Sequence, residues 1–183
     1  MELTKNLTQT KLIKSLVVVI LGSIALTISA KIKIPFYPVP MTMQTFVVVL
    51  MGVTFGWKIG VATISLYLLQ GIIGFPVFAG TPEKGLGLIY FMGPTMGYLI
   101  GFLFATFLAG YLNLKTNIFL IFLKLILSVS IIYILGILWL GHLIGWDKPL
   151  LELGLMPFLL AELFKISLLT ILTKKLIKFR KFI

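Results

Sequence analysis

The stretch Leu153–Thr173, which reads LGLMPFLLAELFKISLLTILT, decides the class of fold. It is long enough to cross a bilayer as a helix, since a crossing takes about 20 mostly apolar residues. It nevertheless carries two charged side chains, Glu162 and Lys165. Ionisable groups at membrane depth cost roughly 2.5–3.5 kcal/mol each, even on lenient scales, and they usually mark a functional site. Because the two residues are spaced i, i+3, they share one helix face, where an acceptor and a donor could together hold a small polar ligand.

The rest of the chain has the composition of a membrane protein. Of its 183 residues, 60% are hydrophobic and only 11% are charged, whereas a soluble domain is usually about a quarter charged. The recurring uncharged runs predict an all-α membrane protein formed by one domain over residues 1–183. We expect a bundle of six transmembrane helices near residues 12–31, 41–56, 58–75, 88–113, 116–141 and 153–174.

The basic residues gather at the ends of these spans. A net charge of +11 would suggest a nucleic-acid partner for a soluble protein, but this distribution points to the lipid bilayer instead. With six spans, ten of the basic residues fall on one side: Lys5, Lys11, Lys14, Lys58, Lys115, Lys174, Lys175, Lys178, Arg180 and Lys181. The positive-inside rule then places both termini in the cytoplasm.

Several kinds of chemistry are excluded or disfavoured by composition. The chain has no cysteine, one histidine and five acidic residues, so disulfides and thiol chemistry are excluded and a metal site is not expected. The segment Gly80–Gly85 has the glycine spacing of a phosphate-binding loop, but Leu86 stands where that motif needs lysine. We therefore expect no ATPase site and no cofactor in this chain.

Two connections on the other side of the membrane are irregular. Pro35, Pro38 and Pro40 predict an extended segment, because proline disfavours helix at itself and at the preceding residue. Irregular backbone at membrane depth needs cover from protein or a watery cavity, so this segment should dip toward a pocket. The glycine-rich connection Gly74–Leu88 is predicted to be a mobile lid.

Small residues recur on two predicted helices. Those of the fourth span are four residues apart and predict close helix packing: Gly93, Gly97, Gly101, Ala105 and Ala109. A shorter stripe on the first span, Gly22, Ala25 and Ser29, could face a neighbouring helix of this fold or dock a different protein.

Three segments and the last span together resemble a known family. They are PVPMTMQT (Pro38–Thr45), GFPVFAG (Gly74–Gly80), GPTMGYLIGF (Gly93–Phe102) and the pair Pro157-Phe158 followed by Glu162 and Lys165. The set is similar to the biotin-specific substrate-binding (S) component of energy-coupling-factor (ECF) transporters. The chain departs from that family in two places. Glu162 stands where an aspartate is usual, and Ala25/Ser29 is the nearest match to alanines four apart on the first helix.

The resemblance implies a biotin-capture subunit with its site open to the outside. It also implies partners, namely a transmembrane coupling (T) subunit and two cytoplasmic ATPases that consume the ATP. In a matching pocket, Glu162 would accept from the ureido N–H groups of biotin and Lys165 would donate to its carbonyl. The other candidate substrate-binding residues are Gln44, Thr45, Phe36, Tyr37, Phe78, Tyr90 and Tyr98, with Lys84 for the carboxylate of the ligand.

Three alternatives remain at this point. An S component for thiamin or riboflavin could use the same pair of charges. An intramembrane enzyme could use Glu162 as acid or base beside Lys165, although the sequence offers no second acid and no nucleophile–base pair. A small channel would need a ring of polar residues from several helices, and only one span here carries buried charge.

Overall fold

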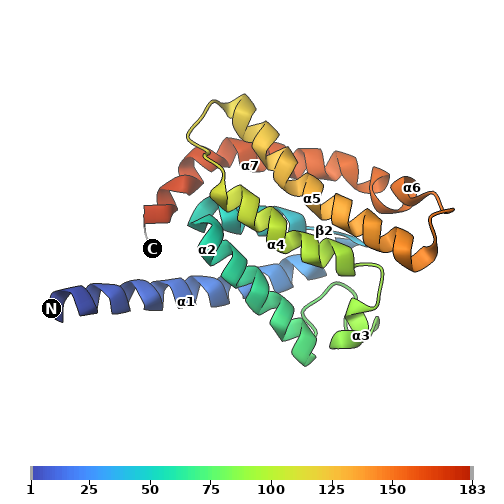
Figure 1. Ribbon diagram of the computed structural model, residues 1–183, viewed down its shortest axis with the longest axis horizontal. Helices are drawn as coiled ribbons and strands as arrows, with labels where there is room; N and C mark the ends of the chain where they lie inside the picture. Colours follow the sequence, from blue (N-terminus) through green and yellow to red (C-terminus); the bar gives the residue numbers. More distant parts are fainter. Residues whose placement is uncertain (1, 182–183) are drawn as a thin grey trace.

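The computed structural model describes residues 2–181, and these are mostly helical (Figure 1). Along the chain the elements are α1 (Glu2–Lys31), β1 (Lys33–Ile34), β2 (Met41–Thr42), α2 (Gln44–Ile73), α3 (Leu88–Phe91), α4 (Met96–Tyr111), α5 (Ile118–Ile144), α6 (Leu150–Gly154), η1 (Met156–Phe158), α7 (Leu159–Leu176) and η2 (Ile177–Lys181). Four helical stretches in the described part are long and apolar enough to cross a membrane: Gln9–Lys31, Gln44–Ile73, Ile118–Ile144 and Leu150–Lys181. A further apolar helix, Met96–Tyr111, is shorter.

The helix α2 is broken at Gly56. The expected spans 41–56 and 58–75 therefore correspond to the two helical arms on either side of this break. At the break Gly56 has φ 81° and ψ 172°, a conformation that only glycine adopts readily. The arms stay close beside the break, because a Cβ on Gly60 would lie 3.2 Å from the Cα of Gly52.

Other boundaries also differ from those expected. The span 88–113 is divided into α3 and α4 around Pro94, which cannot continue a helix that precedes it. The span 153–174 begins as the short α6, continues through η1 around Pro157, and only then becomes α7. The first and fifth helices run beyond their expected ends, to Glu2 and Ile144.

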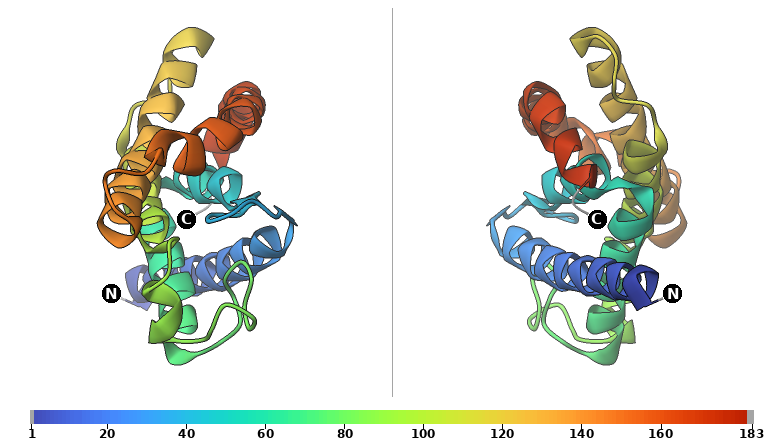
Figure 2. Two further views of the ribbon diagram at one scale, coloured as in Figure 1. Left: turned by 90° about the vertical axis from the view of Figure 1, so that its right-hand side faces the viewer. Right: turned by 90° about the vertical axis from the view of Figure 1, so that its left-hand side faces the viewer.

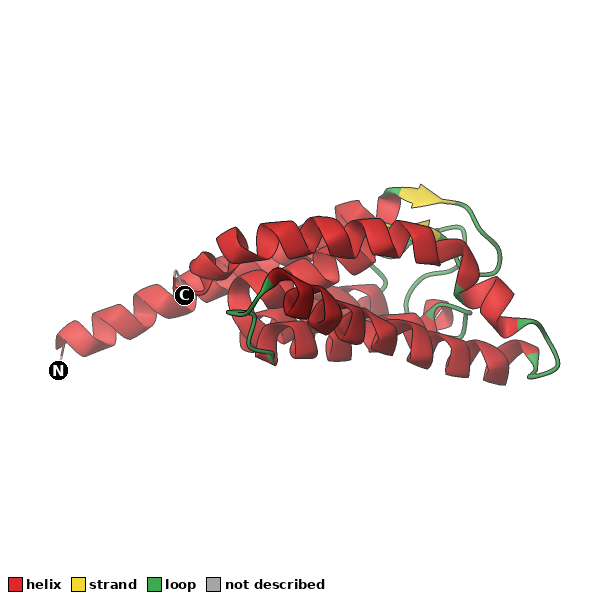
Figure 3. Ribbon diagram, turned by 90° about the horizontal axis from the view of Figure 1, so that it is seen from above, coloured by secondary structure: helices red, strands yellow, loops and turns green. Residues whose placement is uncertain are grey.

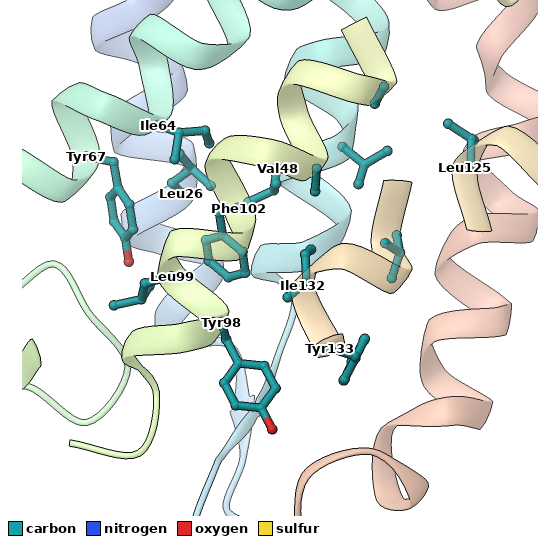
Figure 4. Close-up of a cluster of buried hydrophobic side chains, with 14 of the residues drawn as sticks. Leu26, Val48, Ile64, Tyr67, Tyr98, Leu99, Phe102, Leu125, Ile132 and Tyr133 are labelled. Carbon is teal, nitrogen blue, oxygen red and sulfur yellow. The ribbon is translucent and has the colours of Figure 1, made fainter. Parts of the chain in front are cut away.

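The small residues of α4 pack against helices on both sides, as predicted. A Cβ on Gly97 would lie 2.3 Å from the carbonyl oxygen of Leu135 on α5, and one on Gly101 would lie 2.6 Å from the Cα of Ile132. Such close approach is what small residues permit between membrane helices. Figure 4 shows the resulting core, in which Phe102 of α4 lies beside Ile132 of α5.

The stripe Gly22, Ala25 and Ser29 on α1 lies partly against a neighbouring helix of this fold, which is one of its two expected roles, and its docking of a different protein stays a prediction. Gly22 is buried against α2, where a Cβ would lie 2.6 Å from both Met51 and Thr63. Ser29 is also buried, and only Ala25 is exposed. Gly22 and Ser29 therefore lie on the face of α1 that packs within this fold, whereas Ala25 lies at the surface. Figure 2 shows α1 at the periphery of the bundle.

The irregular segments gather at one end of the molecule. Figures 1 and 3 place β1, β2, α3 and α6 toward one end, and the start of α1 and the end of η2 toward the other. The prolines lie between β1 and β2, which pair Lys33 with Thr42 and Ile34 with Met41. The segment is non-helical, as the prolines predict, but it bends to connect the two strands of a hairpin instead of running as one extended stretch. The hairpin and the connection between α2 and α3 bring loop backbone to the ends of α4, α5 and α7, where the candidate site lies.

Candidate ligand-binding site

Glu162 and Lys165 form a buried ion pair on α7. Their exposed fractions are 5% and 6%, and the Lys165 Nζ lies 2.7 Å from the Glu162 Oε1. The predicted sharing of one helix face is thus present in the structure. Glu162 lies in the first turn of α7, where the positive end of the helix dipole favours a carboxylate. A buried charge pair is tolerated only when hydrogen bonds satisfy its remaining atoms, so the surrounding partners decide what the pair can do.

Partners from β2 and the start of α2, together with Glu162, saturate the lysine. Lys165 Nζ donates to the Thr42 carbonyl at 2.7 Å and to Thr45 Oγ1 at 3.0 Å, in addition to Glu162. An ammonium group has three donors, and these bonds use all of them. Thr45 in turn donates to Glu162 Oε1 at 2.7 Å. The network joins α7 to the hairpin and to α2, and it fixes the orientation of the carboxylate.

The second oxygen of Glu162 is left open. Oε2 is buried and has no hydrogen-bond partner among the described residues. An unsatisfied buried acceptor typically costs about 1–3 kcal/mol, and more when it is charged. A group kept in this state is poised to accept a donor from a ligand, provided that space for a ligand lies beside it.

That space is a mostly apolar cavity. The space between its walls, together with the open solvent at its mouth, is about 520 Å³, and Glu162 lies on its surface. Six elements and three loops form the remaining walls: Val39, Pro40, Met41, Thr42, Gln44, Thr45, Ala79, Tyr90, Thr95, Tyr98, Leu99, Phe102, Ile132, Tyr133 and Phe158. Apolar walls with a few well-placed polar groups are typical of small-molecule sites. Figure 4 shows Tyr98 and Tyr133 on α4 and α5 beside this part of the core.

The hydroxyl groups of two wall tyrosines are tied to backbone. Tyr90 donates to the Ala79 carbonyl at 2.7 Å, and Tyr98 donates to the Gly154 carbonyl at 2.9 Å. Buried tyrosines usually find such partners, and the bonds leave the rings as fixed apolar surfaces. Tyr98 also meets Tyr133 edge to face at 6.0 Å between ring centroids. The rings therefore form a rigid aromatic wall opposite the hairpin.

Gln44 lines the cavity but is partly engaged elsewhere. Its Nε2 donates to the Tyr67 hydroxyl at 2.7 Å, and Thr42 donates to its Oε1 at 3.2 Å. Tyr67 then donates to the Val77 carbonyl at 3.1 Å. These hydrogen bonds hold the Gln44 amide in one orientation. Through Tyr67 they also connect it to the loop between α2 and α3.

The structure brings five of the expected substrate-binding residues to the cavity: Glu162, Gln44, Thr45, Tyr90 and Tyr98. Lys165 lies directly behind Glu162. Phe36 packs edge to face on Phe158 at 6.0 Å, so it supports the rim of the cavity from outside.

Two expected aromatic residues lie elsewhere. Phe78 is only 1% exposed and stacks behind Tyr90 with ring centroids 4.8 Å apart. It fits there because Gly71 has no side chain, since a Cβ at that position would lie 2.0 Å from the Phe78 ring. Tyr37 is 91% exposed and lies on a neighbouring groove, because the prolines around it turn its side chain away from the cavity.

Lys84 lines the same neighbouring groove. Tyr90 and Thr95 border both the groove and the cavity, so the two spaces adjoin. The stem of Lys84 lies against Gly80, where a Cβ would approach it to 2.9 Å. The lysine is exposed and so remains free to meet an anionic group that projects from the cavity.

Sequence reasoning missed several wall residues, above all Tyr133 and Phe102. Both lie in apolar stretches, where nothing distinguishes a cavity wall from a lipid-facing or core position. A tyrosine in the middle of a membrane helix is the one available signal, because its hydroxyl needs a polar environment. Tyr133 lines the same cavity as Glu162. Over residues 2–181, no group of three or more His, Cys, Asp or Glu side chains could hold a metal ion.

Comparison with known proteins gives a consistent result. A family model described as the BioY family matches residues 3–182. The chain is 36% identical over 154 residues to the probable biotin transporter BioY of Pyrococcus horikoshii, covering 84% of this chain and 90% of that protein. It is 34% identical over 154 residues to the biotin transporter BioY of Thermotoga maritima, covering 84% and 89%. The crystal structure of the S-component for biotin from an ECF-type ABC transporter superposes with a TM-score of 0.77 and 26% identity, covering 92% of this chain and 93% of that one.

Proposed function

The chain belongs to the BioY family, and from this premise we propose that it captures biotin from outside the cell and delivers it to an ATP-driven coupling module for uptake. It is a multi-pass membrane protein and a transport subunit rather than an enzyme. The observation that carries the proposal is the open Oε2 of Glu162 at the surface of an apolar cavity. A ligand for this site must present an N–H or O–H group attached to a compact apolar body.

Biotin meets that requirement. Its ureido ring offers two N–H donors and a carbonyl acceptor, its thioether ring is apolar, and its tail ends in a carboxylate. The ureido N–H groups donate to Glu162, which is a charge-assisted interaction and roughly twice as strong as a neutral one. Tyr90 and Tyr98 cover the apolar ring, with Gln44 and Thr45 as further polar contacts.

Two lysines complete the recognition of the ligand. Lys165 reaches the ureido carbonyl when one of its present partners, such as the Thr42 carbonyl, gives way. Lys84 meets the carboxylate of the tail through the groove that adjoins the cavity. The proposed contacts therefore run from a buried charge pair at one pole of the ligand to an exposed cation at the other.

Energy for transport comes from partner subunits. A transmembrane coupling subunit and two cytoplasmic ATPases form the module, and ATP is used there, with no cofactor in this chain. The structural neighbour is an S-component from an ECF-type ABC transporter, and this likeness supports the assignment. An intramembrane enzyme is less well supported, because Glu162 is the one carboxylate on the cavity surface.

Direct titration of the purified protein in detergent tests the proposal. Biotin is expected to bind with one-to-one stoichiometry, whereas thiamin and riboflavin should not compete, because neither offers Glu162 two N–H groups flanking one carbonyl. The methyl ester of biotin should bind more weakly, because it lacks the charge that Lys84 is proposed to meet. Tighter binding of thiamin or riboflavin than of biotin would overturn the proposed substrate.

The proposed topology has six crossings with both termini in the cytoplasm. The crossings are α1, the two arms of α2, α4, α5 and α7. The shared end of the two termini and the ten basic residues on that side support an even number of crossings. The site then opens to the outside.

Cysteine labelling tests this orientation without background, since the native chain has no cysteine. In sealed cells, Thr81→Cys should react with a membrane-impermeant thiol reagent, and Lys178→Cys should react only after the membrane is permeabilised. The reverse pattern of labelling would place the cavity on the cytoplasmic side.

A further inference from the structure

The connection between α2 and α3 includes the segment Val77–Thr81, which is irregular and yet largely buried. Its backbone carbonyls need partners, because irregular backbone in a membrane protein persists only where its polar groups are satisfied. Two partners are buried tyrosines. Tyr67 of α2 donates to the Val77 carbonyl at 3.1 Å, and Tyr90 of α3 donates to the Ala79 carbonyl at 2.7 Å.

The third partner is a lysine at the outer end of α1. Lys31 Nζ donates to the Phe78 carbonyl at 3.0 Å, to the Thr81 carbonyl at 3.3 Å and to Thr81 Oγ1 at 3.1 Å. The three donors of its ammonium group are all directed at this one segment. α1 otherwise packs on α2 and contacts β2. Lys31 thus ties a peripheral helix to a wall of the cavity, because Ala79 of the same segment lines that cavity.

The hydrogen bonds from the two tyrosines and from Lys31 differ in how easily they break. Tyr67 and Tyr90 are 0% and 4% exposed, so breaking their bonds would leave buried groups unsatisfied. Lys31 is exposed, and water can replace each acceptor that it loses. A local opening of the segment therefore begins at Lys31, because elements with exposed hydrogen bonds open at the lowest cost.

We propose that Lys31 is a positioning residue that latches Val77–Thr81 over the cavity and thereby sets how long a bound ligand stays. Lys31 does not line the cavity, so its effect falls on opening and closing of the wall rather than on ligand contacts. This proposal rests on the proposed function, in which the cavity holds biotin. It predicts a change in the dissociation rate constant with little change in the association rate constant.

Rapid-mixing kinetics on the purified protein test the latch. Lys31→Met should raise the dissociation rate constant for biotin by about three- to tenfold, the range that one or two exposed hydrogen bonds carry. Lys31→Arg keeps the donors and should restore most of the wild-type rate constant. Lys33→Met removes a neighbouring exposed lysine of β1 and is the matched control, with an expected change below twofold.

Hydrogen exchange separates failure of the latch from failure of the proposed function. In ligand-free protein, backbone amides of residues 77–85 should exchange faster in Lys31→Met than in wild type or Lys33→Met. If wild-type protein binds no biotin but this exchange difference appears, the latch stands and the proposed substrate fails. If biotin binds while Lys31→Met changes neither exchange nor dissociation, the latch is overturned. Equal changes in Lys33→Met would also overturn it, because the effect would then be one of general surface charge.

Discussion

Replacing Lys165 with methionine is expected to weaken biotin binding by about a hundredfold or more. Removing one partner of a buried ion pair leaves the other charge uncompensated, at a cost of about 3–5 kcal/mol. The Glu162 carboxylate would also lose the Lys165 ammonium group that holds its orientation toward the cavity. Titration calorimetry on protein that elutes as a monodisperse peak measures the loss.

Two companion variants identify the cause of that loss. Lys124→Met is the matched control, since Lys124 is also partly buried and donates to the Asn113 carbonyl, away from the cavity. It should change binding by less than twofold. Glu162→Gln keeps the size of the side chain but replaces its charged acceptor, and should weaken binding by about tenfold or more. A Lys165→Met protein that binds biotin within twofold of wild type would contradict the role of the pair.

The double variant Glu162→Gln/Lys165→Met separates stability from recognition. Because both charges disappear together, thermal stability should recover relative to Lys165→Met alone, whereas biotin binding should not. Such non-additivity in stability is the signature of two groups in direct contact. The distance of 2.7 Å between the Lys165 Nζ and the Glu162 Oε1 makes this pair suitable for such a comparison of single and double variants.

The pair and its neighbours could be predicted because charge inside an apolar helix is a strong signal. Glu162 and Lys165 had to find partners at membrane depth, and polar residues just past the proline segment were the natural candidates. Thr45 and Gln44 do line the cavity, and Thr45 bonds to both charges. The non-helical proline segment could be predicted for a similar reason, because proline has no backbone N–H to donate within a helix.

Features set by close packing could not be predicted in the same way. Phe78 lies behind Tyr90 because Gly71 leaves room for its ring. That fit depends on how closely two segments of the chain approach each other, which the sequence does not indicate. Tyr133 lies in a uniformly apolar run, so periodicity gave no reason to assign it to the cavity. The hydrogen bond from Lys165 to the Thr42 carbonyl likewise depends on where the backbone lies, and the identity of residue 42 does not predict it.

Replacing Gly101 with leucine is expected to destabilise the bundle and abolish biotin binding. A Cβ at this position would lie 2.6 Å from the Cα of Ile132 and 3.3 Å from its carbonyl oxygen. Backbone cannot swing aside as a flexible side chain can, so α4 and α5 must separate. Overpacking of this kind costs about 1–3 kcal/mol, and more where backbone must move. Because Ile132 lines the cavity, the same displacement would deform the site.

Thermal unfolding in detergent measures the first effect, with an expected fall in Tm of about 6–12 °C for a loss of about 3 kcal/mol. Phe104→Leu is the matched control on the same helix, because Phe104 is 52% exposed on the outer surface of the bundle. That variant should change Tm by no more than about 2 °C and should leave biotin binding intact. The Tm of Gly101→Ala should lie between those of Gly101→Leu and Phe104→Leu. Its single methyl group meets the Ile132 backbone but lacks the rest of the leucine side chain. Wild-type Tm and affinity in Gly101→Leu would show that α4 and α5 do not pack as closely as described.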